Sequence, residues 1–277
     1  MPTFEREGLT LSFGDEGQGG QVGEVGNSGP VVLFLHPFPL RGATFRPQID
    51  ALRGDARVVF PDQRGFGAST KAPSPVTTME TMAEDMIRLL DHLSIERAIV
   101  CGCSMGGYVA MAMLRLAVHR VAGLVLFGPN GDADDAKTRE GREAIAAKIE
   151  REGTGVLVDG ATSMLPKLLA APDGPHAPAV RAMIASNNQE GLAAAMRGLG
   201  ARRASHDVLA AYEGPALLVA GGRDVPAPPE KARAIAREMK NVELVEIPNG
   251  GHLVYLEAAD VVNSALHRFV AKATRKD

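Results

Sequence analysis

Short apolar runs alternate with helical stretches along much of this 277-residue chain. Residues 31–35 and 57–60 are mainly apolar and end at His-Pro and Pro-Asp, a pattern typical of strands buried on both faces of a sheet. Further predicted strands lie at residues 98–101, 121–127, 216–220 and 242–247. Predicted helices lie at residues 45–53, 78–93, 105–118, 229–240 and 258–272. This order predicts an α/β fold whose parallel sheet is covered by helices on both faces.

The helix predicted between the second and third of these strands has a well-defined pattern. Its apolar residues recur at helical spacing, whereas Glu84, Asp85 and Asp91 fall on the opposite face. Either Thr77 or Thr78 can cap its first turn. We therefore expect the apolar face to pack on the sheet and the three acidic side chains to face away from it.

Two short strand-like runs precede the alternation, at residues 2–7 and 9–13, and bring the expected number of strands to eight. The segment 14–29 then holds seven glycines among polar residues, which predicts a loop. No phosphate-binding glycine pattern opens a helix there, so the sequence gives no support for a nucleotide site.

The alternation breaks between residues 130 and 213, where no convincing strand is found. Helical patterns lie in this segment at residues 138–152, 155–169, 179–186 and 189–199. Because strands and helices alternate again after residue 213, one sheet is interrupted rather than two domains being joined. We expect a core formed by residues 1–129 and 214–277, with residues 130–213 inserted as a helical cap.

Charge and composition exclude several classes of protein. Thirty Lys and Arg against 33 Asp and Glu give a net charge of -3, which offers no electrostatic reason to bind nucleic acid or anionic lipid. The apolar runs are too short to span a membrane, and the first residues lack the apolar core of a signal peptide. Cys101 and Cys103 are expected to be buried thiols, which suit a reducing compartment. We therefore expect a cytoplasmic protein that acts on a small molecule.

The sequence Gly-Cys-Ser-Met-Gly at residues 102–106 is a G-x-S-x-G motif that follows a predicted strand and opens a predicted helix. Glycines at both ends permit a sharp, strained turn from which the hydroxyl of Ser104 projects. The alternative is an ordinary glycine turn in which Ser104 only caps the helix. In a parallel sheet, ligands collect at the carboxyl ends of the strands, where this motif lies.

Asp224 and His252 follow two later predicted strands, so the chain order is Ser, Asp, His. A serine hydroxyl is a weak nucleophile until a base takes its proton, and an imidazole does this best when a carboxylate orients it. We predict Ser104 as the nucleophile, His252 as the base and Asp224 as the orienting acid. Asp132 and Asp134, which follow an earlier strand, are alternatives for the acid.

Five motifs together resemble those of the α/β-hydrolases of the cap-bearing esterase type, in the order that the family has them. They are LHPFP at 35–39, PDQRGFGAS at 61–69, GCSMGGY at 102–108, GGRD at 221–224 and GH at 251–252. The chain is similar to small carboxylesterases, enol-lactone hydrolases and cofactor-free haloperoxidases over essentially its whole length. The resemblance implies an eight-stranded, mostly parallel sheet with a helical cap, and a reaction that needs no metal or organic cofactor.

The resemblance also implies an oxyanion hole made by the backbone N–H groups of Phe38 and Met105. The family usually has glycine after the strand-end histidine, whereas this chain has Pro37, and Pro39 restricts Phe38 to extended backbone geometry. His36 is expected to organise this loop rather than to transfer a proton.

Several nearby side chains have plainer expected roles. By the resemblance, Asp62 and Arg64 belong to a structural turn. Cys103 should point away from Ser104, because neighbouring residues at a strand end face opposite ways. Neither His176 nor His206 has a partner at metal-binding spacing, and the sequence has no H-E-x-x-H motif, so a metal site is not expected.

The cap is expected to form the pocket for the acyl group. Its candidates for an apolar lining are Met164, Met183 and Met196. A substrate carboxylate could be bound by Arg197, Arg202 and Arg203. The alternative is that these three side chains lie on a solvated helix face. The scarcity of aromatic residues in the cap favours a small to medium, mostly uncharged acyl group.

The sequence therefore predicts a serine hydrolase that cleaves a carboxylic ester or lactone through an acyl-enzyme. One alternative keeps the same site but lets hydrogen peroxide attack the acyl-enzyme, as in a perhydrolase. Another is a ligand receptor in which the cap recruits a partner. The complete set of Ser104, Asp224 and His252 favours an enzyme, and a homodimer is left open.

Overall fold

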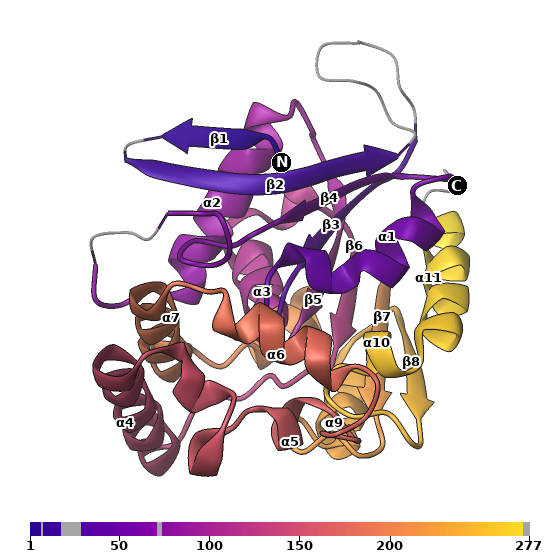
Figure 1. Ribbon diagram of the computed structural model, residues 1–277. Helices are drawn as coiled ribbons and strands as arrows, with labels where there is room; N and C mark the ends of the chain where they lie inside the picture. The colour runs from indigo at the N-terminus through magenta and orange to yellow at the C-terminus, as the bar shows by residue number, and fades with distance from the viewer. Residues whose placement is uncertain (7, 18–28, 71–73, 274–277) are drawn as a thin grey trace.

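The computed structural model describes residues 1–6, 8–17, 29–70 and 74–273, and its centre is one eight-stranded sheet (Figure 1). The strands are β1 (Thr3–Arg6), β2 (Leu9–Gly17), β3 (Val31–Leu35), β4 (Arg57–Pro61), β5 (Ala98–Cys103), β6 (Val121–Phe127), β7 (Ala216–Gly221) and β8 (Val242–Ile247). Their order in the sheet is β1-β2-β4-β3-β5-β6-β7-β8. The predicted number of strands is confirmed.

All neighbouring strands from β4 to β8 pair in parallel, and only β1 and β2 add antiparallel pairs. The central strands are buried on both faces, as their apolar sequences predicted. Strand β2 is longer than the predicted run at 9–13, because its polar end pairs with β4 and Asp15 binds Arg57 at 2.7 Å. The rest of the predicted glycine loop, residues 18–28, lies outside the described residues.

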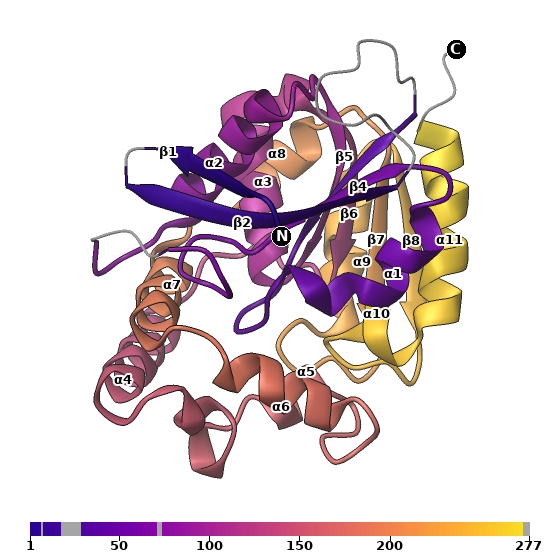
Figure 2. The ribbon, with the colours of Figure 1, turned by 45° about the horizontal axis from the view of Figure 1, so that its top comes forward.

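Helices cover both faces of the sheet (Figure 2). The core helices are α1 (Arg46–Leu52), α2 (Met79–His92), α3 (Met105–Ala117), α8 (His206–Ala211), α9 (Pro229–Glu238), α10 (Val254–Glu257) and α11 (Ala259–Ala273). Helix α1 packs with α11, and α2 packs with α3 on the opposite face. Among the described residues, no helix has the length and apolar character needed to cross a membrane.

Helix α2 confirms one expectation and corrects another. The hydroxyl of Thr78 accepts a hydrogen bond from the N–H of Thr81 at 3.1 Å and so caps the helix. Asp85, expected to face away from the core, is buried and forms a two-point ion pair with Arg64, at 2.5 and 2.7 Å. The expectation was wrong because the loop after β4 covers this face of α2, which periodicity along one helix does not reveal.

The segment after β6 continues into helices α4 (Ala136–Glu152), α5 (Leu165–Leu168), α6 (Ala177–Ala185) and α7 (Gln189–Ala201), which lie beyond the carboxyl ends of the strands (Figure 1). The single helix expected at 155–169 is wrong. Two 3-10 turns, Thr154–Leu157 and Gly160–Thr162, precede the short α5. Gly160 has a φ of 74°, which interrupts a right-handed helix. Helix α8 lies inside the segment expected as the cap, residues 130–213, but it packs against α3 and α9 on the flank of the sheet, so the expected end of the cap lies too far along the chain.

Candidate active site

Ser104 occupies a strained turn between β5 and α3. Its backbone has φ 49° and ψ -112°, a conformation that is costly for a residue other than glycine. A Cβ atom at Gly102 would overlap the backbone of Gly106, and one at Gly106 would overlap the carbonyl of Leu35. The two glycines of the motif therefore let β3, β5 and α3 approach closely enough to hold Ser104 in this turn.

Asp224 and His252 follow strands β7 and β8, and their side chains are in contact. Nδ1 of His252 lies 2.7 Å from Oδ2 of Asp224, and both side chains are buried. Oδ1 of Asp224 accepts the N–H of Ala227 at 2.8 Å, so the carboxylate is fixed from its other side. An ionised carboxylate can accept a hydrogen bond but cannot donate one. Nδ1 therefore carries the proton of the neutral ring, and Nε2 is left to act as a base.

The other two predicted acids have partners elsewhere. Asp132 binds Lys231 and the Nε2 atom of His206, the latter at 2.9 Å. Asp134 lies between Arg142 and Arg202. Of the three carboxylates considered, the structure brings Asp224 to His252.

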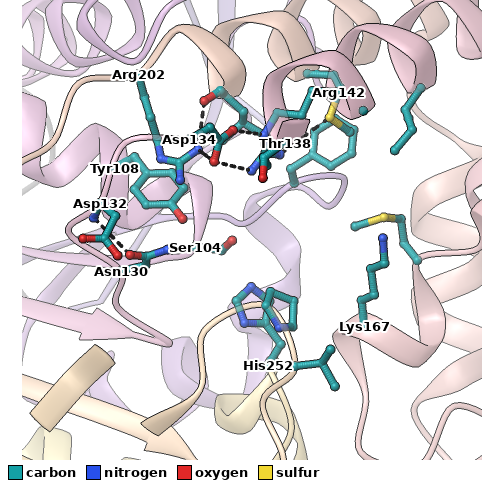
Figure 3. A pocket seen from close by; sticks show the side chains of 18 of the residues that line it. Ser104, Tyr108, Asn130, Asp132, Asp134, Thr138, Arg142, Lys167, Arg202 and His252 are labelled. Atoms are coloured by element: carbon teal, nitrogen blue, oxygen red, sulfur yellow. Dashed lines mark hydrogen bonds and ion pairs between the residues drawn. The ribbon is translucent and has the colours of Figure 1, made fainter. Parts of the chain in front are cut away.

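Ser104 and His252 line the same cavity, whose volume is about 630 Å³ (Figure 3). Within the described residues, the Ser104 hydroxyl has no hydrogen-bond partner. Hydrogen bonds between catalytic groups are often long without substrate and tighten when it binds. The arrangement thus presents a hydroxyl and an oriented imidazole to one cavity.

Gly128, which the sequence analysis did not single out, lies against the Asp224–His252 pair. It has a φ of 57°, and a Cβ atom there would lie 2.7 Å from Oδ2 of Asp224 and 3.0 Å from Nδ1 of His252. The only available signal was its place directly after the strand β6, at the same edge of the sheet as the predicted site.

The loop that carries His252 is tied to the cap. Glu257 accepts the N–H of Gly251 and the N–H of Ala170, both at 2.8 Å. The N–H of Leu253 donates to the carbonyl of Leu168 at 2.9 Å. The segment around α5 therefore packs directly on the histidine loop, a contact between distant segments that the sequence analysis also missed.

His36 organises the loop after β3. Its ring is completely buried, and Nε2 accepts the N–H of Gln63 at 2.9 Å, so Nδ1 carries the proton and donates to the carbonyl of Pro37 at 3.1 Å. Burial lowers the pKa of His36 to about 4, against the opposing charge of Asp62. The ring is neutral near pH 7 and has a fixed tautomer, so it acts as a structural hydrogen-bonding group.

The two predicted oxyanion residues belong to the loop after β3 and to the start of α3. Phe38 lines the cavity, and Met105 is the first residue of α3, directly after Ser104. The N-terminal N–H groups of a helix have no partner within the helix and point toward the space before it. The peptide bond between Phe38 and Pro39 is cis.

Asp62 and Arg64 hold the turn after β4 in place. Oδ1 of Asp62 accepts the N–H of Gly42 and Oδ2 accepts the N–H of Ala68, each at 3.0 Å. Arg64 is engaged by Asp85. Neither side chain lines the cavity, so the structure places both in structural contacts.

Cys103 is fully buried and contacts the carbonyl oxygen of His252, with Sγ at 3.8 Å. Burial, together with the charge of Asp224, raises the pKa of this thiol well above its usual range. The thiol is therefore protonated at neutral pH and is unsuited to act as a nucleophile beside Ser104.

The cap side of the cavity is more polar than the sequence suggested. Met164 and Met196 line it, whereas Met183 does not and packs, half-buried, against the apolar core. Tyr108 of α3 lines the cavity, as do these polar and charged residues of the segment after β6: Asn130, Asp132, Asp134, Asp135, Thr138, Arg142, Lys167 and Arg202. Figure 3 shows most of these side chains gathered above and beside Ser104.

Only one of the three cap arginines considered for a carboxylate lines the cavity. The buried Arg202 binds Asp134 at 2.6 Å, and its guanidinium lies 4.3 Å from the ring centre of Tyr108. Arg197 binds Glu143 and Glu150 on the outside of the cap, at 2.9 and 2.6 Å. Arg203 is exposed.

Comparisons with known proteins bear on the family of this chain. A model of the alpha/beta hydrolase family matches residues 32–265. The chain is 30% identical over 220 residues to 3-oxoadipate enol-lactonase 1 of Acinetobacter baylyi, a match that covers 79% of this chain and 77% of that protein.

Two further relatives span most of the chain. It is 29% identical over 255 residues to the dihydrolipoyllysine-residue acetyltransferase component of the acetoin cleaving system of Pseudomonas putida, a match that covers 89% of this chain but only 65% of that longer protein. A solved structure of a thermophilic esterase from Thermogutta terrifontis, with malate bound, is similar with a TM-score of 0.88 at 35% identity, covering 99% of this chain and 97% of the other.

Proposed function

Because the chain belongs to the alpha/beta hydrolase family, we propose that it is a serine hydrolase that cleaves carboxylic esters or lactones through an acyl-enzyme at Ser104. The observation that carries the proposal is the cavity lined by both the strained Ser104 and an imidazole that a buried carboxylate orients. The similarity to an enol-lactonase and to an esterase supports the choice of substrate class.

In the first half-reaction, the Ser104 oxygen attacks the carbonyl carbon while Nε2 of His252 takes the hydroxyl proton. Asp224 stabilises the imidazolium that forms, because its carboxylate lies against Nδ1 in a buried site. The N–H groups of Phe38 and Met105 donate to the oxyanion, and the N-terminal end of α3 adds a favourable dipole.

The tetrahedral intermediate then loses its alcohol, whose oxygen receives the proton from His252. In the second half-reaction, His252 takes a proton from water, and the resulting hydroxide attacks the acyl carbon. Collapse of this intermediate returns the proton to Ser104 and releases the carboxylic acid. In a lactone, the alcohol and the acid are parts of one product. Every proton is handled by His252, so the proposed reaction uses no metal or organic cofactor.

The cavity also bears on the acyl group. A volume of about 630 Å³ is that of an ordinary small-molecule pocket, which supports a small to medium substrate. Apolar side chains such as Ile145, Leu168 and Leu199 offer contacts for an alkyl chain. The proposal includes a cytoplasmic location, which the two unbridged, buried thiols Cys101 and Cys103 support.

The proposal is tested with p-nitrophenyl esters from acetate to decanoate, using wild type, Ser104→Ala and Ser94→Ala. Ser94 is a matched control, because it also has a positive φ, of 55°, but is exposed and outside the cavity. We expect Ser104→Ala to lower kcat by roughly 10⁶-fold, as removal of a serine nucleophile does elsewhere.

Ser94→Ala should leave turnover unchanged, and the optimum chain length should report the size of the pocket. Turnover that survives Ser104→Ala would refute the proposal. Peroxide competing better than water for the acyl-enzyme would favour the perhydrolase alternative. Binding of esters without turnover would favour the receptor.

A further inference from the structure

Asn187, between α6 and α7, joins the cap to the loop that carries Phe38. Its amide Nδ2 donates to the carbonyl of Pro39 at 2.7 Å and to the carbonyl of Met183 at 3.0 Å. Its Oδ1 accepts the N–H of Gly67 at 2.8 Å. The side chain is buried, and both of its polar atoms are thus bound to backbone groups of the cap and of two core loops.

The contact with Pro39 completes a set of anchors along the loop at residues 36–42. The start of the loop is held by His36, which binds Gln63, and its end by Gly42, whose N–H donates to Asp62. Both of these partners belong to the turn after β4. The middle of the loop, next to Phe38, is held by Asn187 from the cap.

Asn187 itself is held firmly in place, because α7 packs tightly on the core. A Cβ atom at Gly65 would lie 2.9 Å from the Cα atom of Gly191, so the two backbones are nearly in contact. The N–H of Thr77 donates to the carbonyl of Ala194 at 3.0 Å. Asn188 caps α7 by accepting the N–H of Gly191 at 3.0 Å. The start of α7 is therefore a rigid support for the Asn187 side chain.

We infer that Asn187 is a positioning residue for the oxyanion hole, through which the cap sets the place of the Phe38 N–H. This inference rests on the proposed function. The Pro39 carbonyl follows the peptide bond between Phe38 and Pro39, so holding that oxygen limits rotation of the segment that presents the Phe38 N–H. The cap thus contributes to stabilising the transition state as well as to enclosing the acyl group.

A purely structural role would have a different signature. In that case, loss of Asn187 would lower the stability of the folded protein and would lower the turnover of all kinds of substrate by the same factor. A positioning role weakens one interaction in particular, the hydrogen bonds to the developing oxyanion. Esters and the matching thionoesters separate the two roles, because a thiocarbonyl sulfur accepts hydrogen bonds more weakly than a carbonyl oxygen.

The test measures kcat and KM for a p-nitrophenyl ester and its thionoester with wild type, Asn187→Ala, Asn187→Asp and Asn263→Ala. Asn187→Ala should lower kcat for the ester by roughly 10- to 100-fold, the range expected when a catalytic donor is misplaced, with little change in KM. The ratio of ester to thionoester turnover should fall with it. Asn263 in α11 also donates to a proline carbonyl, that of Pro47 at 3.3 Å, but lies outside the cavity, so Asn263→Ala should leave that ratio at the wild-type value.

Asn187→Asp keeps an acceptor for the Gly67 N–H but loses the donor to Pro39, so it should match Asn187→Ala in the ester to thionoester ratio. It also provides a second variant if Asn187→Ala does not fold. If a folded Asn187 variant has the wild-type ratio of ester to thionoester turnover, the positioning role is overturned. The hydrolase proposal still stands in that case if turnover by wild type depends on Ser104. Absence of Ser104-dependent turnover in wild type would overturn both.

Discussion

Nδ1 of His252 lies 2.7 Å from Oδ2 of Asp224, with both side chains almost completely shielded from solvent. The other carboxylate oxygen is occupied by the N–H of Ala227, which leaves the carboxylate a single orientation toward the ring. A charge in such a buried place acts on the imidazole with little screening. The geometry thus fixes the tautomer and the orientation of the His252 ring.

Asp224→Asn should therefore lower kcat by about 10⁴-fold, as in other serine hydrolases whose histidine loses its orienting carboxylate, and leave KM little changed. The amide keeps the shape of the side chain but can present N–H to Nδ1 and stabilise the wrong tautomer. Steady-state kinetics on one p-nitrophenyl ester give the comparison. A loss of this size in Asp132→Asn, with Asp224→Asn active, would instead assign the acid to the loop after β6.

Gly128→Ala should impair catalysis by displacing the same pair. The added methyl group would lie 2.7 Å from the Asp224 carboxylate, and the φ of 57° is unfavourable for alanine. Gly54→Ala is the matched control, because nothing lies within 4 Å of a Cβ atom there. We expect at least about a 10-fold loss of kcat for the first variant and wild-type kinetics for the second. Equal kinetics in both variants would show that the contact does not matter.

The buried His36 predicts a specific dependence of stability on pH. Its pKa is about 4 in the folded protein, below its usual value of 6.5, because burial disfavours the charged ring. Between these values the unfolded chain binds a proton that the folded protein does not, so stability falls as the pH falls. The difference between the two pKa values corresponds to about 3 kcal/mol of folding stability, which is present near pH 7 and fully lost below pH 4.

His36→Gln is the matched variant, because the glutamine side chain can also accept and donate hydrogen bonds but does not titrate. The free energy of unfolding, measured with urea from pH 7 to pH 4, should fall by about 3 kcal/mol more in wild type than in this variant. Parallel curves for the two proteins would contradict the lowered pKa.

Arg202 and Arg197 should differ sharply when each is replaced by methionine. Arg202 and its partner Asp134 are both buried, and removing one side of a buried pair costs up to about 3 to 5 kcal/mol. Arg142, the second partner of Asp134, offsets part of this cost. The partners of Arg197 are largely exposed, and such pairs contribute about 1 kcal/mol or less. Chemical denaturation of the two variants gives the comparison, and equal losses would contradict this assignment.

The sheet was predictable because its strands carry their own signal. A parallel strand covered on both faces must be apolar at nearly every position, and the run at 31–35 has the bounds of β3. The turn after β5 was also recognisable, since Gly102 and Gly106 mark a close approach of backbones. In both cases the relevant information lies within a few consecutive residues.

Contacts between distant segments were not predictable from one sequence. Asp85 was placed on the wrong face, because its partner Arg64 belongs to a loop that covers α2. Nothing near Asn187 indicates that it reaches Pro39, which lies 148 positions earlier. The prediction of one helix at 155–169 was wrong for a local reason. It relied on the helical spacing of the apolar residues and gave too little weight to the glycine at 160, which interrupts the helix in the structure.

The most direct test of the account is to trap the acyl-enzyme. Wild type is mixed with excess p-nitrophenyl ester, quenched in acid within milliseconds, digested and analysed by mass spectrometry. The account predicts an acyl mass increase on the peptide that contains Ser104, and none in Ser104→Ala. Acylation of another residue, or steady turnover with no acylated peptide at any quench time, would contradict a covalent mechanism at Ser104.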